Sequence, residues 1–376
     1  MKKQLLCTSA IALGCAMAAP AAAQDWNVRV GGYYNQHLGY ANVSGNANTG
    51  ADFDGFDIFT NAEIHIKPTI TLDNGLTFGA HVEFEAMNTG GARIDESYVI
   101  VSGDQLGRFL IGSENSAGYL MTVAAPGIGI GIASPSASAF IPVSTALPAG
   151  TFNFRQAMIS PWVEVAGNND VQRLTYFTPS FNGLTVGVSY ARQGSFNTGS
   201  INTSPVDNNT TGVTDVFDIA VAYSQSFNGV DLDLSARWGT ADSNVVGISD
   251  PEVWAIGASV GFNGFTIGGT YAENDNGGPG GVGGANGFAD QEGWGLGASY
   301  DIPGPWTVAF DTWQGEQSQG VGVGKLEYTA YQLGARRSLG KGVAWQVYAV
   351  QSEGKDKAAG LTSKGTLLAT SINLSF

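Results

Sequence analysis

The sequence predicts an all-β fold, a transmembrane antiparallel β-barrel of about sixteen strands, and three observations support it. Apolar and polar residues alternate in one segment after another, which is the period of a strand with two unlike faces. The segments are joined alternately by short turns and by longer polar loops. Only 13% of the residues are charged, against roughly 25% in an average soluble domain.

The first 23 residues are predicted to lie outside this fold. A lysine pair, an apolar stretch and an Ala-x-Ala site ending at residue 23 are the successive parts of a cleaved secretory signal peptide. Both cysteines, Cys7 and Cys15, lie within it, so the exported chain 24–376 would contain no disulfide. A lipoprotein signal modified at Cys15 is the alternative. It is disfavoured because Ala12 stands where a large aliphatic residue is usual.

Net charge and hydropathy exclude two further classes of protein. Removing two lysines with the signal peptide changes the net charge from −15 to −17, and so acidic a chain is a poor candidate for nucleic-acid binding. The longest uncharged run, 115–154, contains four prolines, which a membrane-spanning helix would have to absorb. Without such a helix, only a closed barrel satisfies the backbone hydrogen bonds across a bilayer.

Sixteen alternating segments follow one another along the chain. In the third, Phe78 and Val82 share one parity while His81, Glu83 and Glu85 share the other. The segments begin near residues 26, 56, 75, 93, 107, 170, 183, 213, 229, 251, 264, 290, 305, 325, 341 and 364. Each is long enough for the roughly 9–11 residues that a tilted transmembrane strand needs. The fourth and fifth segments alternate poorly, so the count could differ by two.

The connections differ between the two ends of the predicted barrel. Tight turns, several with Asn-Gly, follow the even-numbered segments, because Asn-Gly tolerates the positive φ of two-residue hairpins. Longer polar loops follow odd-numbered segments, as at 42–55, 193–212, 274–289 and 354–363. Aromatic residues near the strand ends, such as Trp254, fit interfacial girdles. A soluble secreted sandwich is the alternative, and it would need an unusually large number of strands.

Five stretches together carry a family resemblance: 61–68 running into 71–76, 94–98, 107–112, 124–127 and the terminal Phe376. With them the chain resembles the general porins of the Gram-negative outer membrane, most closely the alphaproteobacterial branch. The resemblance implies sixteen strands, usually a homotrimer, and passive diffusion of ions and small hydrophilic solutes through a water-filled channel. The implied partners are outer-membrane lipid, lipopolysaccharide and the solutes.

The resemblance also implies that the loop after the fifth strand folds into the lumen as a constriction. In this chain that loop is 113–169, with Glu114, Tyr119 and Arg155 as candidate constriction residues. An external loop over the mouth is the alternative. The family usually places acidic residues on this loop, yet nothing between residues 115 and 154 is charged, so ion selectivity stays open.

Side chains on the polar parity are expected to line the pore. The basic ones are Arg29, Lys67, Arg93, Arg108, Arg173, Arg237 and Arg336; the acidic ones are Glu63, Glu83, Glu85, Asp231 and Asp233; the histidines are His37, His65 and His81. Pairing across the turn at residues 73–75 would place His65 near Glu83 and Lys67 near His81. The spacing matches no metal motif, so these histidines are expected to line the pore, where imidazoles titrate near neutral pH.

No cofactor, metal or catalytic activity is expected. Neither Gly-x-Ser-x-Gly nor a phosphate-binding loop occurs in the sequence. Two alternatives to a general diffusion pore remain: a barrel plugged by its long loop that acts as an enzyme or adhesin, and a substrate-specific porin. A continuous water path past residues 115–154 would distinguish an open pore from a plugged barrel.

Overall fold

The computed structural model describes residues 25–87, 94–143, 147, 157–193, 212–245, 248–276, 290–318 and 324–376, so the predicted signal peptide lies outside the described residues. These residues form sixteen strands: β1 (Asn27–Ser44), β2 (Gly55–Thr71), β3 (Thr77–Glu85), β4 (Ile94–Gly103), β5 (Gly107–Glu114), β6 (Val171–Phe177), β7 (Leu184–Gln193), β8 (Val213–Phe227), β9 (Val230–Ser243), β10 (Glu252–Phe262), β11 (Phe265–Asp275), β12 (Gln291–Asp301), β13 (Trp306–Ser318), β14 (Lys325–Gly340), β15 (Val343–Asp356) and β16 (Leu361–Ser375). Within the described part of the chain, no helix is long and apolar enough to cross a membrane.

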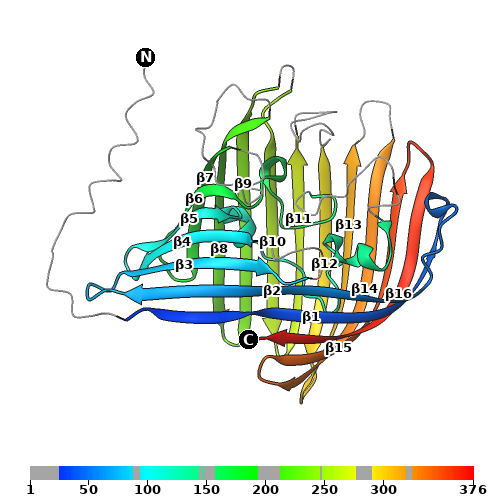
Figure 1. Ribbon diagram of the computed structural model, residues 1–376, viewed down its shortest axis with the longest axis horizontal. Coiled ribbons are helices and arrows are strands. Elements are labelled where there is room, and N and C mark those ends of the chain that lie inside the picture. Colours follow the sequence, from blue (N-terminus) through cyan, green and yellow to red (C-terminus); the bar gives the residue numbers. More distant parts are fainter. Residues whose placement is uncertain are drawn as a thin grey trace.

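The strands form one closed antiparallel barrel in which each pairs with its neighbours in sequence and β16 pairs with β1 (Figure 1). Closure leaves no strand edge with unpaired backbone groups. Every strand begins within three residues of its predicted start, and the strand count of sixteen is confirmed.

The Asn-Gly turns have the predicted backbone. Asn228 and Asn263 have φ of 50° and 51°, and the glycines that follow them have φ of 82° and 81°. These angles let Phe227 pair with Val230, and Phe262 with Phe265, across two-residue turns.

One predicted loop is much shorter than expected. The stretch 354–363 is predicted to be a polar outer loop, but β15 continues to Asp356 and β16 begins at Leu361. Only residues 357–360 turn, with Gly360 at a φ of 65°. The prediction is wrong because polar residues on both faces, here above the apolar belt, do not prevent the ladder from continuing.

The outer surface of the barrel is apolar. Side chains such as Ile256, Ile267, Leu296 and Leu333 are exposed there, as lipid-facing residues of a membrane barrel are. Aromatic pairs border this belt, with ring centroids 5.0 Å apart for Trp254 and Tyr271 and 5.7 Å apart for Trp306 and Trp345. The aromatic girdles predicted from the sequence therefore contain tilted and edge-on pairs.

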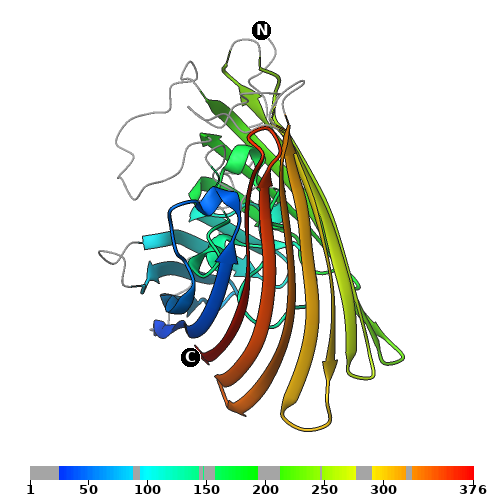
Figure 2. The same ribbon diagram turned by 90° about the vertical axis from the view of Figure 1, so that its right-hand side faces the viewer.

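The wall differs in height around the barrel. Strands β3 to β6 have 9, 10, 8 and 7 residues, whereas β8 and β14 have 15 and 16. Figure 1 shows the short strands stacked beside β2, and Figure 2 shows the long strands of the C-terminal half running side by side. We call β3 to β6 the short wall of the barrel and β7 to β16 its long wall.

The described part of the connection between β5 and β6 lies against the inside of the barrel (Figure 1). Its described residues include α1 (Ala117–Leu120) and two 3-10 turns, η2 (Pro135–Ala139) and η3 (Val165–Gly167); a third such turn, η1 (Asn46–Asn48), follows β1. One buried apolar cluster joins Ile130, Phe140 and Ile141 of the connection to inward residues of β1 and β13 to β16. A second joins Val163 and Val165 to inward residues of β6 to β11. We call the described residues of this connection, 115–143, 147 and 157–170, the inner loop.

Candidate functional site

Glycines on the long wall determine how closely the inner loop approaches it. A Cβ atom on Gly293 or Gly315 would lie 1.9 Å from the carbonyl oxygen of Ala157 or Met158, respectively. On Gly257 or Gly334 it would lie 2.0 Å from a loop carbonyl oxygen, that of Val123 or Ile128. A side chain at any of these inward positions of β10, β12, β13 and β14 would displace the loop. Because glycine has no side chain, the loop backbone lies directly on the wall.

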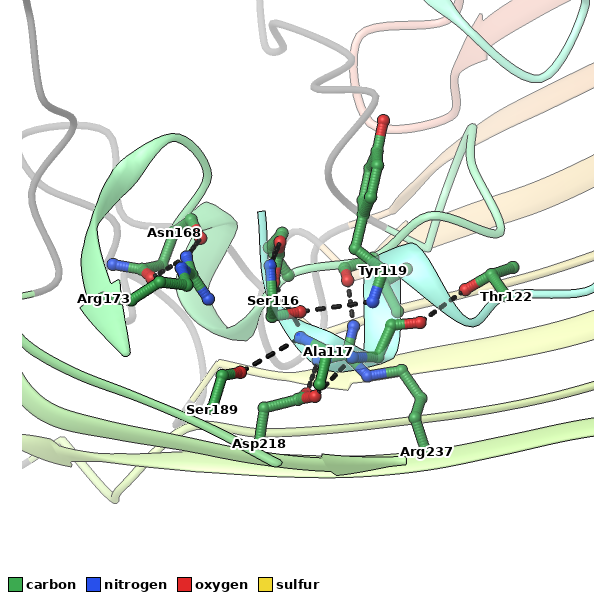
Figure 3. A network of polar contacts seen from close by, with 12 residues as sticks. Ser116, Ala117, Tyr119, Thr122, Asn168, Arg173, Ser189, Asp218 and Arg237 are labelled. Atoms are coloured by element: carbon green, nitrogen blue, oxygen red, sulfur yellow. Dashed lines mark hydrogen bonds and ion pairs between the residues drawn. The ribbon is translucent and has the colours of Figure 1, made fainter. Parts of the chain in front are cut away.

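Hydrogen bonds fix the first turn of the inner loop to the wall (Figure 3). The backbone N–H of Ala117 donates to Ser189 Oγ at 3.0 Å, and that of Gly118 donates to Asp218 Oδ1 at 2.6 Å. These donors belong to α1, whose first N–H groups have no partner within the helix. Tyr119, a predicted constriction residue, also lies on α1, and its ring points away from this network.

A buried group of charges lies under the same turn. Arg237 contacts the Asp218 carboxylate and the carbonyl oxygen of Val163, and its Nη2 lies 4.0 Å from Glu164 Oε2. Glu164 also accepts the backbone N–H of Ser116 at 2.8 Å. All three charged side chains are almost fully buried, so the ion pairs hold the two ends of the inner loop together on β8 and β9.

On β13 and β14, polar side chains of the long wall form hydrogen bonds with the inner loop among apolar contacts. Gln332 accepts the backbone N–H of Ile130 at 3.0 Å and donates to Asp311 at 3.1 Å. The Tyr328 hydroxyl donates to the carbonyl oxygen of Ile132 at 2.7 Å, and Trp313 Nε1 donates to that of Met158 at 3.0 Å. The inner loop is therefore bonded to the wall at intervals from β7 to β14.

The opposite side of the lumen is acidic, and a β-bulge accounts for part of that acidity. Phe84 pairs with Ile94 and Val82 with Ser97, so Asp95 and Glu96 together face the single residue Glu83. Because of the extra residue, both acids reach the inner side of the wall, where Asp95 lies close to Glu63 and Glu85. The bulge also explains why this segment alternates poorly in the sequence.

We call this surface the acidic wall; its carboxylates are Glu63, Glu83, Glu85, Asp95, Glu96 and Glu114. Glu96 accepts a hydrogen bond from Asn115 Nδ2 at 2.5 Å, which ties the acidic wall to the start of the inner loop. Glu63 accepts the Tyr33 hydroxyl at 2.6 Å.

Two of the predicted histidines lie within the acidic wall. His65 pairs with Glu83 across β2 and β3, as predicted. His81 is next to them, and the His65 and His81 ring centroids are 5.1 Å apart. His37 lies elsewhere, on β1, with its Nδ1 2.7 Å from the Tyr348 hydroxyl of β15.

The remaining predicted pore residues are distributed along the barrel. Arg173 is buried, and its Nη2 donates to the backbone and side-chain oxygens of Asn168 at 2.7 and 2.8 Å. Toward the short turns lie Arg29, Lys67, Arg108, Arg336, Asp231 and Asp233. Arg29 pairs with Lys67 in register, and Arg108 lies over the Phe177 ring. Arg93 and Arg155 lie outside the described residues.

Sequence reasoning missed the residues that hold the inner loop, among them Glu96, Glu164, Asp218, Asp311 and Gln332. A usable signal is present in β12, where Gly293, Gly295 and Gly297 occupy the inward parity. Apolar residues on both parities, as at Leu367 and Leu368, give another, because an inward apolar row needs a covering element. Either pattern could have indicated where the loop lies on the wall.

Comparison with known proteins gives the following matches. The model of a family described as Gram-negative porin matches residues 8–357. An anion-selective porin from Comamonas acidovorans is 18% identical, with a TM-score of 0.61, and the match covers 94% of this chain and 100% of that one. The outer-membrane channel DcaP of Acinetobacter baumannii is 12% identical, with a TM-score of 0.61, and the match covers 93% and 97%. A variant of the Rh. blastica porin is 18% identical, with a TM-score of 0.54, and the match covers 93% and 100%. A search of curated protein sequences gave no significant match.

Proposed function

The chain belongs to the Gram-negative porins, and we propose that this outer-membrane diffusion channel favours cations over anions. The acidic wall is the observation that supports the proposal. Six carboxylates gather on β2 to β5, at the level where the inner loop begins. Rings and rows of acidic side chains attract cations into a pore.

The positions of the basic residues support the same preference. Among the described residues of β2 to β5, the two basic side chains, Lys67 and Arg108, lie on the short-turn side of the acidic wall, which Lys67 borders two residues from His65. Arg173 and Arg237 are deeper in the barrel, but their charges are engaged by the inner loop and by Asp218. The Comamonas porin is described as anion-selective, yet at 18% identity it shares the fold alone with this chain.

The inner loop would narrow the channel without closing it. It follows the long wall from β7 to β16, because the wall glycines let it lie flat there. Its described charged residues, Glu164 and Asp170, are buried, so the passage would run between the loop and the acidic wall. Solutes would then be selected by size and charge, and no enzymatic step is part of this proposal.

We further propose that three copies assemble through the short wall, β3 to β6. A transmembrane strand needs roughly 9–11 residues, and β5 and β6 have only 8 and 7. Contact with a neighbouring copy would cover a wall too short to match the bilayer by itself. Lipid and lipopolysaccharide would then surround the long walls of the trimer.

The experiment is a measurement of single-channel conductance and reversal potential in a planar bilayer under a tenfold KCl gradient. A stepwise conductance with a reversal potential of the sign set by K⁺ permeation is expected. The double variant Glu63→Gln/Glu85→Gln should move the reversal potential toward zero. The double variant Asp231→Asn/Asp233→Asn, near the short-turn end, serves as the matched charge control. A reversal potential set by chloride would refute the cation preference, and absence of conductance from a folded barrel would refute an open pore.

A further inference from the structure

Two histidines and a glutamate on adjacent strands form a compact group at the acidic wall. His81 Nε2 lies 2.8 Å from Glu83 Oε1, and His65 Nε2 lies 3.4 Å from Glu83 Oε2. One ligand atom from each of the three residues lies within 4.8 Å of the other two. Zinc bonds of about 2.0–2.2 Å in a tetrahedron place ligand atoms about 3.3 Å apart. The group therefore has nearly the dimensions of a metal site before any metal is added.

The surroundings of His81 orient it for metal binding. Its Nδ1 lies 2.6 Å from the Tyr98 hydroxyl, so the two groups share a hydrogen bond. When Nδ1 carries the proton and donates it to this hydroxyl, the lone pair of Nε2 is available to a metal ion. Metal-binding histidines commonly have such a partner on the other ring nitrogen.

His81 Nε2 is also poorly satisfied by hydrogen bonding. It lies 2.8 Å from Glu83 Oε1, but this contact does not have the geometry of a hydrogen bond, although His81 is only 7% exposed. A buried polar atom without a hydrogen bond costs free energy. The unsatisfied nitrogen faces the Glu83 carboxylate, the position where a shared metal ion would satisfy both groups.

The charges around the group favour a cation. Glu63 Oε2 lies 3.0 Å from His65 Nε2, and Glu85, Asp95 and Glu96 lie on the same wall. Lys67 is the next inward residue of β2 and opposes binding, but the carboxylates outnumber it. Imidazole and carboxylate ligands together suit zinc, copper or nickel, whereas calcium and magnesium prefer oxygen ligands alone.

We propose that His65, His81 and Glu83 bind one divalent transition-metal ion, of which zinc is the simplest representative, at the wall of the channel. Three protein ligands leave a fourth position for water or Glu63. The bound ion would partly neutralise the acidic wall and would link β2 to β3. Metal binding as such does not depend on the proposed cation preference, whereas its effect on conductance does.

The test is titration calorimetry of the untagged, refolded, metal-free protein with ZnCl₂, and separately with CaCl₂. One zinc ion per chain should bind, more tightly than calcium. His81→Gln and Glu83→Gln should each weaken zinc binding about tenfold or more, and Tyr98→Phe, which keeps all three ligands, should weaken it about 10–100-fold. His37→Gln is the matched control and should bind as the unmodified protein does.

A heat-modifiable band in electrophoresis shows that each variant is folded, so that lost binding is not lost structure. Zinc binding that is unchanged in both His81→Gln and Glu83→Gln would overturn the proposal, as would equal weakening in His37→Gln. In bilayers, zinc should lower the cation conductance reversibly, with recovery on adding EDTA, and His81→Gln should abolish this effect. If zinc binds at this site but conductance does not change, the site stands and the charge argument for the channel fails.

Discussion

The charged side chain of Arg237 is almost completely buried. It is buried against Asp218 and Glu164, and these acids also hold the backbone N–H groups of Gly118 and Ser116. A buried ion pair is weak evidence for stability in itself, but removing one partner leaves an unpaired charge. Arg237 is therefore more important for the seating of the inner loop than for the electrostatics of the pore.

Replacing Arg237 by glutamine should destabilise the protein by about 3–5 kcal/mol, because Asp218 and Glu164 remain buried without it. The double variant Asp218→Asn/Arg237→Gln should recover part of the loss. Urea unfolding in lipid vesicles measures both, with Arg336→Gln, an exposed arginine, as the control. If the single and double variants are equally unstable, the unpaired charge is not the cause.

Gly334 tests the contact between the inner loop and the wall. A methyl group there would lie 2.0 Å from the carbonyl oxygen of Ile128, so Gly334→Ala should push the loop into the passage and lower the single-channel conductance. Gly340, on the same strand, has no atom within 4 Å of an added Cβ, and Gly340→Ala should conduct as the unmodified channel does. Equal conductance in the two variants would contradict a loop that lies directly on the wall.

Residue positions on the strands were largely predictable, whereas their partners were not. Alternation placed His65 opposite Glu83 because pairing across a known turn fixes the register. It could not show that Asp95 and Glu96 share one face, since a bulge is a local departure from that same alternation. The partners of Arg173 and Arg237 lie on the inner loop, which has no periodicity from which to predict contacts.

Among the elements, β11 to β14 bring four glutamates into one row. Glu273 pairs with Glu292, Glu292 with Glu316, and Glu316 with Glu327, all on the outward face near the long-loop end. Lys325 and Lys357 offset one end of the row, where they contact Glu316 and Glu327. Like charges directly opposite each other in a sheet are destabilising.

Replacing Glu292, in the middle of the row, by glutamine should stabilise the barrel by about 0.2–1 kcal/mol. The Tyr271 hydroxyl, 3.0 Å from Glu292, keeps an acceptor in that variant. Glu353→Gln is the control of opposite sign, because Glu353 lies 2.6 Å from Lys355 and pairs with Lys364. Unfolding should be measured in neutral lipid with EDTA, so that no divalent ion screens the row. A stabilising Glu353→Gln or a destabilising Glu292→Gln would contradict the repulsion.

Strand existence was the most predictable property of the elements, because few structures besides a strand produce an alternating pattern over ten residues. Their ends were less predictable: β15 and β16 extend past the apolar belt, and nothing in the polar residues 354–363 separates ladder from loop. The turns at Asn228 and Asn263 were predictable because the required φ selects their residues.

The whole molecule is asymmetric, and its asymmetry leads to a prediction about assembly. If copies associate through the short wall, a fluorophore on Val99→Cys of β4 should be shielded from brominated lipid. The same label on Ile267→Cys of β11 should be quenched. Both residues are exposed on the outer face of one chain, which makes them a matched pair. Light scattering should give the mass of three chains, and equal quenching at the two positions would exclude the short wall as the interface.

For the whole molecule, the sequence predicted that the strands close into a barrel, but it did not predict how the interior of the barrel is packed. Sixteen alternating segments joined by short and long connections predict a closed barrel, because only closure pairs all their backbone groups within a membrane. The two apolar clusters inside it were harder to foresee, because the interior of a membrane barrel is expected to be polar.

The inner loop packs on glycines of the wall, and the genetic code makes these positions easy to change. Any glycine codon becomes an alanine codon by a single nucleotide change. One such change would place a methyl group at any of four wall positions and move the loop toward the passage. These positions are Gly257, Gly293, Gly315 and Gly334. A bacterium exposed to a toxic solute that enters by this route could therefore restrict its uptake by point mutation, without losing the barrel.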